Sequence, residues 1–134
     1  HDGDGPTEGF TALRAAAQEN QVETVKMLCE MGANVNVQGD DTPLYSAAAG
    51  GHFEVVKILI DYGADVNNDQ SVGGTALHVA CHNSHVDVVQ FLLLHGANPT
   101  LLDYEGHDCL FDASHGGNKK LEKLILEAMK NYKK

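Results

Sequence analysis

Blocks of apolar residues at helical spacing alternate along the chain with polar stretches rich in glycine, asparagine and aspartate. The clearest block holds Val55, Val56, Ile58, Leu59 and Ile60, a spacing that favours one face of an α-helix. A slimmer block precedes it, and the alanines at 47–49 leave room there for close packing. Both blocks recur, so the pattern predicts successive pairs of helices. A glycine ends each bulky block except the last, as a left-handed C-terminal cap would, at Gly32, Gly63 and Gly96.

The predicted helix pairs belong to an internal repeat. Residues 11–36, 42–67 and 75–100 align without gaps, and residues 108–129 form a fourth, more degenerate copy. The equivalent leucines Leu13, Leu44, Leu77 and Leu110 lie 31, 33 and 33 residues apart, so the first junction is the shortest. A threonine, or Asp108 in the last copy, stands before each alanine-rich block. Its side-chain oxygen is expected to cap the helix N-terminus.

The segments TALRAA (11–16), TPLYSA (42–47) and TALHVA (75–80) are similar to the T-P-L-H-x-A signature of the ankyrin repeat, a unit of about 33 residues. The chain therefore resembles the ankyrin-repeat family over about residues 9–129. The resemblance implies an all-α solenoid of stacked helix-turn-helix units with projecting β-turn or hairpin fingers. Only the second copy keeps Thr-Pro, and only the third keeps the signature histidine, as His78. Arg14, Tyr45 and Phe111 take its place elsewhere.

The repeat divides the chain into a short lead-in and one domain. We expect residues 1–8 to be a flexible lead-in and residues 9–134 to hold four repeats, at about 9–38, 39–70, 71–103 and 104–134. The last repeat is predicted to be a C-terminal cap, because terminal units of a solenoid need a polar outer face. Glu122 occupies the position of Val25, Val56 and Val89, and no glycine ends the second helix.

Composition and charge limit the classes of partner. No apolar run in the 134 residues approaches the roughly 18 to 20 residues that span a bilayer, and no signal peptide is visible. Three widely spaced cysteines without a C-x-x-C pair favour a reducing cytoplasmic or nuclear setting, with each thiol in the core. The net charge is −10: residues 119–134 carry +4 and the remainder −14. Because an acidic body repels phosphates, we expect neither nucleic acid nor a membrane as partner. We also expect the chain to be a monomer.

The stretch HVACHNSH (78–85) contains three histidines and a cysteine, which raises the question of a metal site. His78 and His82 could share a helix face, as zinc ligands in H-E-x-x-H do, but Val79 replaces the general base and no third ligand lies nearby. The resemblance implies structural roles instead. His78 would bond near Thr75, Cys81 would pack inside the stack, and His85 would link neighbouring units. Only His82 is left for function, and we expect no metal or other cofactor.

Motifs for catalysis are absent from the sequence. There is no G-x-S-x-G, no cysteine in a catalytic signature and no phosphate-binding glycine loop. The many carboxylates fall mostly on turns and exposed helix positions, which favours a solvated surface over paired acid–base chemistry. We therefore expect that the chain is not an enzyme.

Similar proteins bind partners through finger tips and through the first-helix faces that line a concave surface. The resemblance therefore implies a protein-binding scaffold. Exposed aromatic residues beside acids favour a partner segment of basic or amphipathic character. Carried over position by position, the candidate contact residues are Phe10, Gln18, Glu19, Asp41, Tyr45, Ala49, Val72, His82, Asn83, Tyr104, Glu105, His107, Asp112 and His115.

Two other functions stay open at this point. The array could be the substrate-recognition part of a larger enzyme complex, such as a ubiquitin ligase. It could also be a substrate, because Asn36 and Asn67 follow Leu28 and Leu59 by eight residues, where similar proteins undergo asparaginyl hydroxylation. The competing interpretation is a turn asparagine whose side chain bonds the backbone.

Overall fold

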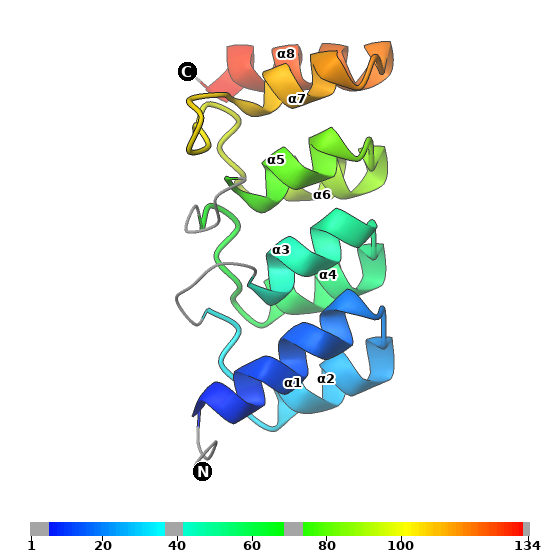
Figure 1. Ribbon diagram of the computed structural model, residues 1–134, viewed down its shortest axis with the longest axis vertical. Helices are drawn as coiled ribbons and strands as arrows, with labels where there is room; N and C mark the ends of the chain where they lie inside the picture. Colours follow the sequence, from blue (N-terminus) through cyan, green and yellow to red (C-terminus); the bar gives the residue numbers. More distant parts are fainter. Residues whose placement is uncertain (1–5, 37–41, 69–73, 133–134) are drawn as a thin grey trace.

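The computed structural model describes residues 6–36, 42–68 and 74–132, and eight helices lie within these ranges. They form four consecutive pairs that stack one on the next (Figure 1). The first helices of the pairs are α1 (Pro6–Gln18), α3 (Pro43–Gly50), α5 (Ala76–His82) and α7 (Cys109–His115). The second helices are α2 (Val22–Glu30), α4 (Phe53–Asp61), α6 (Val86–Leu94) and α8 (Lys119–Tyr132). The predicted all-α repeat architecture is confirmed, and the segments between pairs contain no β-strand within the described ranges.

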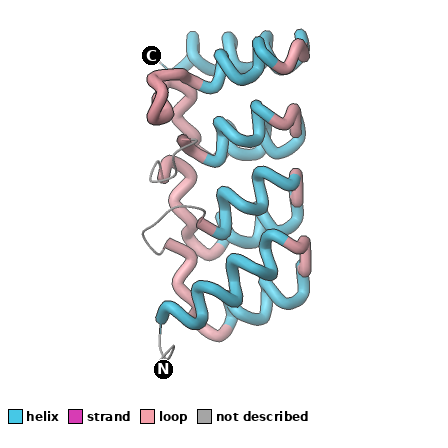
Figure 2. Tube along the Cα trace, in the orientation of Figure 1, coloured by secondary structure: helices cyan, strands magenta, loops and turns pink. Residues whose placement is uncertain are grey.

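The helices lie in two layers. The first helices of the pairs contact one another in sequence and form an inner layer, and the second helices form an outer layer behind it. The described parts of the segments that lead from one pair to the next gather along one side of the stack, next to the N-terminal ends of the inner helices (Figure 2). We call these segments the fingers, and we call the fingers together with the exposed side of α1, α3, α5 and α7 the inner face.

One continuous core runs between the two layers. The repeated leucines Leu13, Leu44 and Leu77 are at most 3% exposed, and Leu59 and Leu92 of the outer helices are fully buried. Buried alanines fill the contacts between successive inner helices, where larger side chains would hold the helices apart.

The helix ends follow the sequence signals in the later repeats. The side-chain oxygens of Thr42 and Asp108 accept hydrogen bonds from the backbone N–H groups of Tyr45 and Phe111, at 3.2 and 3.1 Å. Thr75 does the same for the N–H of His78, at 3.4 Å. The predicted caps are therefore confirmed there. The C-terminal glycines Gly32, Gly63 and Gly96 have φ angles of 91°, 94° and 95°, the left-handed conformation that was predicted.

The first repeat departs from its prediction. Helix α1 begins at Pro6, so residues 6–8 are helical rather than part of a flexible lead-in, and Thr11 lies within the helix rather than before it. Proline suits the first position of a helix because its φ angle is preset and its missing N–H is not needed there. Glu8 falls in the first turn, where acidic residue types favour the start of a helix. These two signals compete with Thr11 for the start of the helix.

The last repeat differs from the others in its second helix. Helix α8 has 14 residues, whereas α2, α4 and α6 have 9 each. Glu122 is half-buried at the position where Val25, Val56 and Val89 are fully buried. This arrangement supports a polar outer face on the last repeat, and its role as a cap stays a prediction.

The cysteines lie in the core, as predicted. Cys29, Cys81 and Cys109 are unpaired and buried. A hydrogen bond with Cys109, together with burial, raises the pKa of the Cys81 thiol well above its ordinary value, and burial also raises the pKa of Cys29. Such thiols stay protonated at neutral pH and are poor nucleophiles. Within the described ranges, none of the helices combines the length and apolar character that crossing a bilayer requires.

Candidate partner-binding surface

The residues predicted to bind a partner lie along the inner face and are densest around α5, α7 and the finger between them. The described ones are Gln18 and Glu19 at the end of α1, Tyr45 and Ala49 in α3, His82 and Asn83 at the end of α5, Tyr104, Glu105 and His107 in the last finger, and Asp112 and His115 in α7. All of them are exposed or half-buried. Phe10 belongs to α1, but its side chain lies outside the described residues, as do Asp41 and Val72.

The histidines of residues 78–85 have separate surroundings. His78 is 2% exposed; its Nδ1 accepts a hydrogen bond from the N–H of Thr75, and its Nε2 donates one to the carbonyl of His107, both at 3.0 Å. His85 Nε2 donates to the carbonyl of Ala49 in the preceding repeat, at 3.1 Å. Cys81 is fully buried. The structural roles that the family resemblance implied for these three residues are therefore what the structure shows.

His82 contacts the fourth repeat on the inner face, in addition to the bond from His78 to His107. Its Nδ1 lies 3.6 Å from a carboxylate oxygen of Asp112, and the two side chains are 69% and 15% exposed. Burial raises the pKa of Asp112, and the nearby His78 and His82 offset only part of this effect. As the pH falls, Asp112 therefore loses its charge before an ordinary aspartate does. The sequence pointed to both residues but not to their contact.

The last finger is a tight turn built around Asp103. One carboxylate oxygen of Asp103 accepts hydrogen bonds from the N–H groups of Glu105 and His107, both at 2.9 Å, and its own N–H donates to the carbonyl of His107 at 2.8 Å. Burial raises the pKa of Asp103, but the two backbone bonds and the neighbouring histidines outweigh it, so that the net pKa is lowered. The carboxylate stays ionised and holds the turn. This turn also exposes Tyr104 to solvent, with 67% of the residue accessible.

A column of three rings runs from the finger along α7. The rings of His107 and Phe111 are stacked, with centroids 3.6 Å apart and planes 9° apart. The rings of Phe111 and His115 are tilted by 36°, with centroids 4.2 Å apart. Phe111 is 37% exposed and was not among the predicted contacts. The signal that could have identified it is its place at the signature-histidine position, with histidines four residues away on either side.

Two groups of possible metal ligands occur in the described part of the chain: His78 with Asp103 and Asp112, and Asp103 with Glu105 and His107. In the first group both ring nitrogens of His78 already bond to the protein. In the second, one Asp103 oxygen already accepts the two N–H bonds of the turn. His78 and His82 are not brought together with a third ligand within the described residues. The hydrogen bonds of His78 and Asp103 hold the finger against the start of α5.

Comparison with known families identifies the fold. The family model for ankyrin repeats matches three times, over residues 1–70, 38–103 and 66–134. The chain belongs to the ankyrin-repeat family. A search among curated proteins returned no match. Ankyrin repeats are in general protein–protein interaction modules and are typically non-catalytic.

The two asparagines considered for modification link neighbouring ankyrin repeats. The side chain of Asn36 donates to the carbonyl of Gly63 and accepts from the N–H of Asp65, both at 2.7 Å. Asn67 repeats the arrangement one unit later, donating to the carbonyl of Gly96 at 3.1 Å and accepting from the N–H of Asn98 at 2.7 Å. Each side chain therefore satisfies backbone groups of the next repeat. These bonds favour a structural role, and hydroxylation of either asparagine stays a prediction.

We expect Asn67→Ala to lower the free energy of unfolding of the ankyrin array by about 1–3 kcal/mol, because it leaves a carbonyl and an N–H of the next repeat without their protein partner. Chemical denaturation monitored by circular dichroism measures the change. Asn131→Ala, at an exposed position of α8, is the control and should change stability by less than about 0.5 kcal/mol. Equal stability of the two variants would show that the link contributes nothing.

Proposed function

We propose that this ankyrin array is a non-catalytic scaffold that binds a basic or amphipathic protein segment on its inner face, centred on α5, α7 and the last finger. The observation that carries the proposal is the ring column His107–Phe111–His115 with carboxylates beside it. Large, pre-positioned aromatic side chains are typical of residues that contribute most of the affinity at interfaces.

The charges around the ring column support a basic partner. A carboxylate oxygen of Glu105 lies 3.7 Å from His107, and the Glu105 side chain is 79% exposed. Asp112 flanks the column on α7, and Glu19 is exposed at the far end of the inner face. Lysine and arginine side chains can pair with these acids while their stems, or neighbouring apolar residues, cover the rings. Complementary charges of this kind guide a partner to its site and set its orientation.

The surface is also held in a fixed shape before a partner arrives. Asp103 fixes the turn of the finger, His78 ties the finger to the start of α5, and the Asp108 cap fixes the start of α7. A partner then meets a surface that does not have to be ordered, which lowers the entropic cost of binding.

A charge-reversal experiment tests the proposal. The probe is a synthetic amphipathic peptide of alternating leucine-rich and arginine-rich turns, titrated calorimetrically at several salt concentrations. We expect Glu105→Lys and Asp112→Lys each to weaken binding by about tenfold and to reduce its salt dependence. Glu23→Lys and Asp61→Lys on the outer helices are matched controls with the same change of net charge.

The two sets of variants separate a local effect from a general one. Equal weakening by the control substitutions would show that only net charge matters. Unchanged binding and unchanged salt dependence in Glu105→Lys and Asp112→Lys would overturn the proposal. So would a peptide with glutamate in place of arginine that binds equally well and is weakened to the same extent by Glu105→Lys and Asp112→Lys.

A further inference from the structure

The outer helix of the third repeat lacks a charge pair that the other repeats have. At equivalent positions four residues apart, the second helices carry Lys26 with Glu30, Lys57 with Asp61, and Lys123 with Glu127. Opposite charges at this spacing are neighbours on a helix surface. In α6 the same two positions hold Gln90 and Leu94. Leu94 is 82% exposed, so a leucine stands in solvent where each sibling repeat has a carboxylate.

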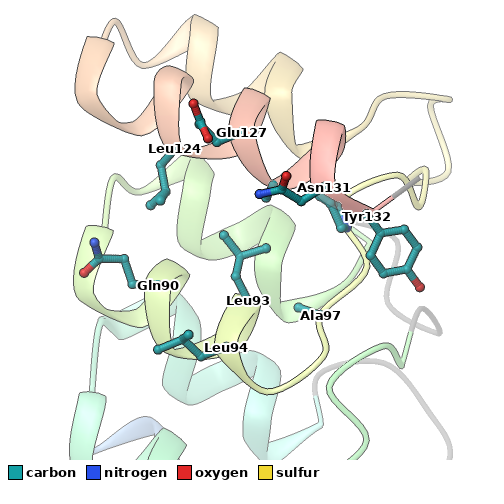
Figure 3. Close-up of a pocket in the computed structure, with 10 residues that line it drawn as sticks. Gln90, Leu93, Leu94, Ala97, Leu124, Glu127, Asn131 and Tyr132 are labelled. Carbon is teal, nitrogen blue, oxygen red and sulfur yellow. The ribbon is translucent and has the colours of Figure 1, made fainter. Parts of the chain in front are cut away.

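Leu94 borders an apolar groove between α6 and α8 (Figure 3). The groove has a volume of about 580 Å³. Leu93 and Leu94 line it from α6, Leu124 and Tyr132 line it from α8, and Ala97 and Pro99 line it from the segment after α6. Figure 3 shows Leu93, Leu124 and Tyr132 around an open trough on the outer layer, away from the inner face.

The sequence explains part of why the groove lies here rather than one repeat earlier. Between α4 and α6, the rings of Phe53 and Phe91 meet edge to face with centroids 5.3 Å apart. One repeat later the equivalent positions in α6 and α8 hold Val86 and Leu124, which are smaller. Two aliphatic side chains fill less of the space between the helices than two rings do. Helix α6 therefore lacks the charge pair on its own surface, and it also lacks the aromatic pair on the side that faces α8.

The rim of the groove is basic at one end. Lys120 and Lys123 line an adjoining depression, which shares Gln90, Leu124 and Glu127 with the groove. Lys120 stands where the other repeats have Glu23, Glu54 and Asp87, so the charge of this position is reversed in α8. Two lysines and Glu127 give this end of the groove a local charge of +1, so an apolar floor lies beside a net positive rim in a chain whose net charge is −10.

We propose that the α6–α8 groove is a second docking site, which binds an amphipathic helix of a partner protein that carries acidic residues beside its apolar stripe. A helix of this kind can place leucine-like side chains in the trough beside Leu94 and direct its carboxylates to Lys120 and Lys123. The site is separate from the inner face and has the opposite charge preference. The scaffold can then hold two different partners on its two layers.

The test uses two synthetic helical peptides with leucines at i, i+3, i+4 and i+7. One carries glutamate at the flanking positions and the other lysine, and each is titrated into the isotope-labelled array by NMR. The acidic peptide is expected to shift the amide signals of α6 and α8 and to leave α5 and α7 unchanged. Leu94→Glu, which installs the residue type of the sibling repeats, is expected to weaken binding at least about tenfold. Asp61→Asn, on the surface of α4 at the equivalent position, is the matched control and should bind like the wild type.

Each remaining outcome overturns the proposal. The acidic peptide could fail to shift the signals of α6 and α8, the basic peptide could shift those same signals as strongly as the acidic one, or Leu94→Glu could leave the shifts unchanged. Sedimentation of the peptide-free array supplies a further outcome. A dimer that Leu94→Glu abolishes would assign the groove to a second copy of the chain instead. Leu94 is exposed, so Leu94→Glu is expected to fold like the wild type. Its unfolding curve checks this before the titration.

Discussion

Leu92→Ala is expected to lower the free energy of unfolding by about 2–5 kcal/mol, the range for deleting a fully buried leucine side chain. Leu92 is 0% exposed and lies in α6, at the centre of the core shared by the layers. Its removal loses apolar burial and leaves a cavity between helices that are fixed by their neighbours. In a stack where each repeat contacts only those beside it, a weakened third repeat also weakens the coupling between the two ends. Chemical denaturation measures both effects, as a lower midpoint and, if the coupling breaks, as a second transition.

Leu94→Ala is the matched control for that prediction, since it makes the same chemical change two residues later in the same helix. Leu94 is 82% exposed, so its truncation is expected to change the free energy of unfolding by less than about 0.5 kcal/mol. Similar losses in both variants would mean that the outer surface of α6 is covered in the folded chain. This result would contradict both the assignment of the core and the open groove.

The sequence predicted the stack because a repeat multiplies every weak signal. One alanine-rich block or one glycine decides little, but four leucines in register define the helix pairs and the end of each pair. The same register assigned the structural roles of His78, Cys81 and His85 correctly. The start of α1 was missed because two sets of start signals, at Pro6 and Thr11, compete within one segment. Which of them begins the helix depends on packing that a single segment does not reveal.

The candidate site was only partly predictable for a related reason. Register shows which residues lie on the inner face, and it therefore identified His82, Glu105, His107 and Asp112. It does not show which side chains meet across repeats, since this depends on rotamers and on the distance between α5 and α7. The pairing of His82 with Asp112 and the ring column through Phe111 were missed for that reason.

The groove could not be predicted from the run VVQFLLL (88–94), whose apolar character does not show which of its leucines are buried. The structure places Leu92 in the core and Leu94 on the surface. Comparison of equivalent positions between repeats, rather than inspection of the run itself, is what distinguishes the two leucines.

The second large effect is expected from His78→Ala, which should lower the free energy of unfolding by about 2–4 kcal/mol. His78 bonds through both ring nitrogens, and the neutral tautomer with its proton on Nε2 satisfies both bonds. The substitution leaves the N–H of Thr75 without its partner, removes one of the two hydrogen bonds to the carbonyl of His107, and opens a cavity at a position that is 2% exposed. Because the His107 carbonyl belongs to the last finger, loosening of the finger should also weaken binding at the inner face.

His82→Ala, one helical turn later in α5, separates the structural effect from the functional one. The His82 side chain is 69% exposed and lies 3.6 Å from Asp112, and a pair with one solvent-exposed member adds little to stability. We expect His82→Ala to leave the free energy of unfolding within about 0.5 kcal/mol of the wild type. We expect it to change the affinity for the arginine-containing peptide that probes the inner face. Asn67→Ala should leave that affinity unchanged. Denaturation and calorimetry on the same samples measure both quantities. A His82→Ala variant that unfolds as easily as His78→Ala would show that both histidines of the cluster are structural, and the inner-face proposal would then rest on the ring column and its acids alone.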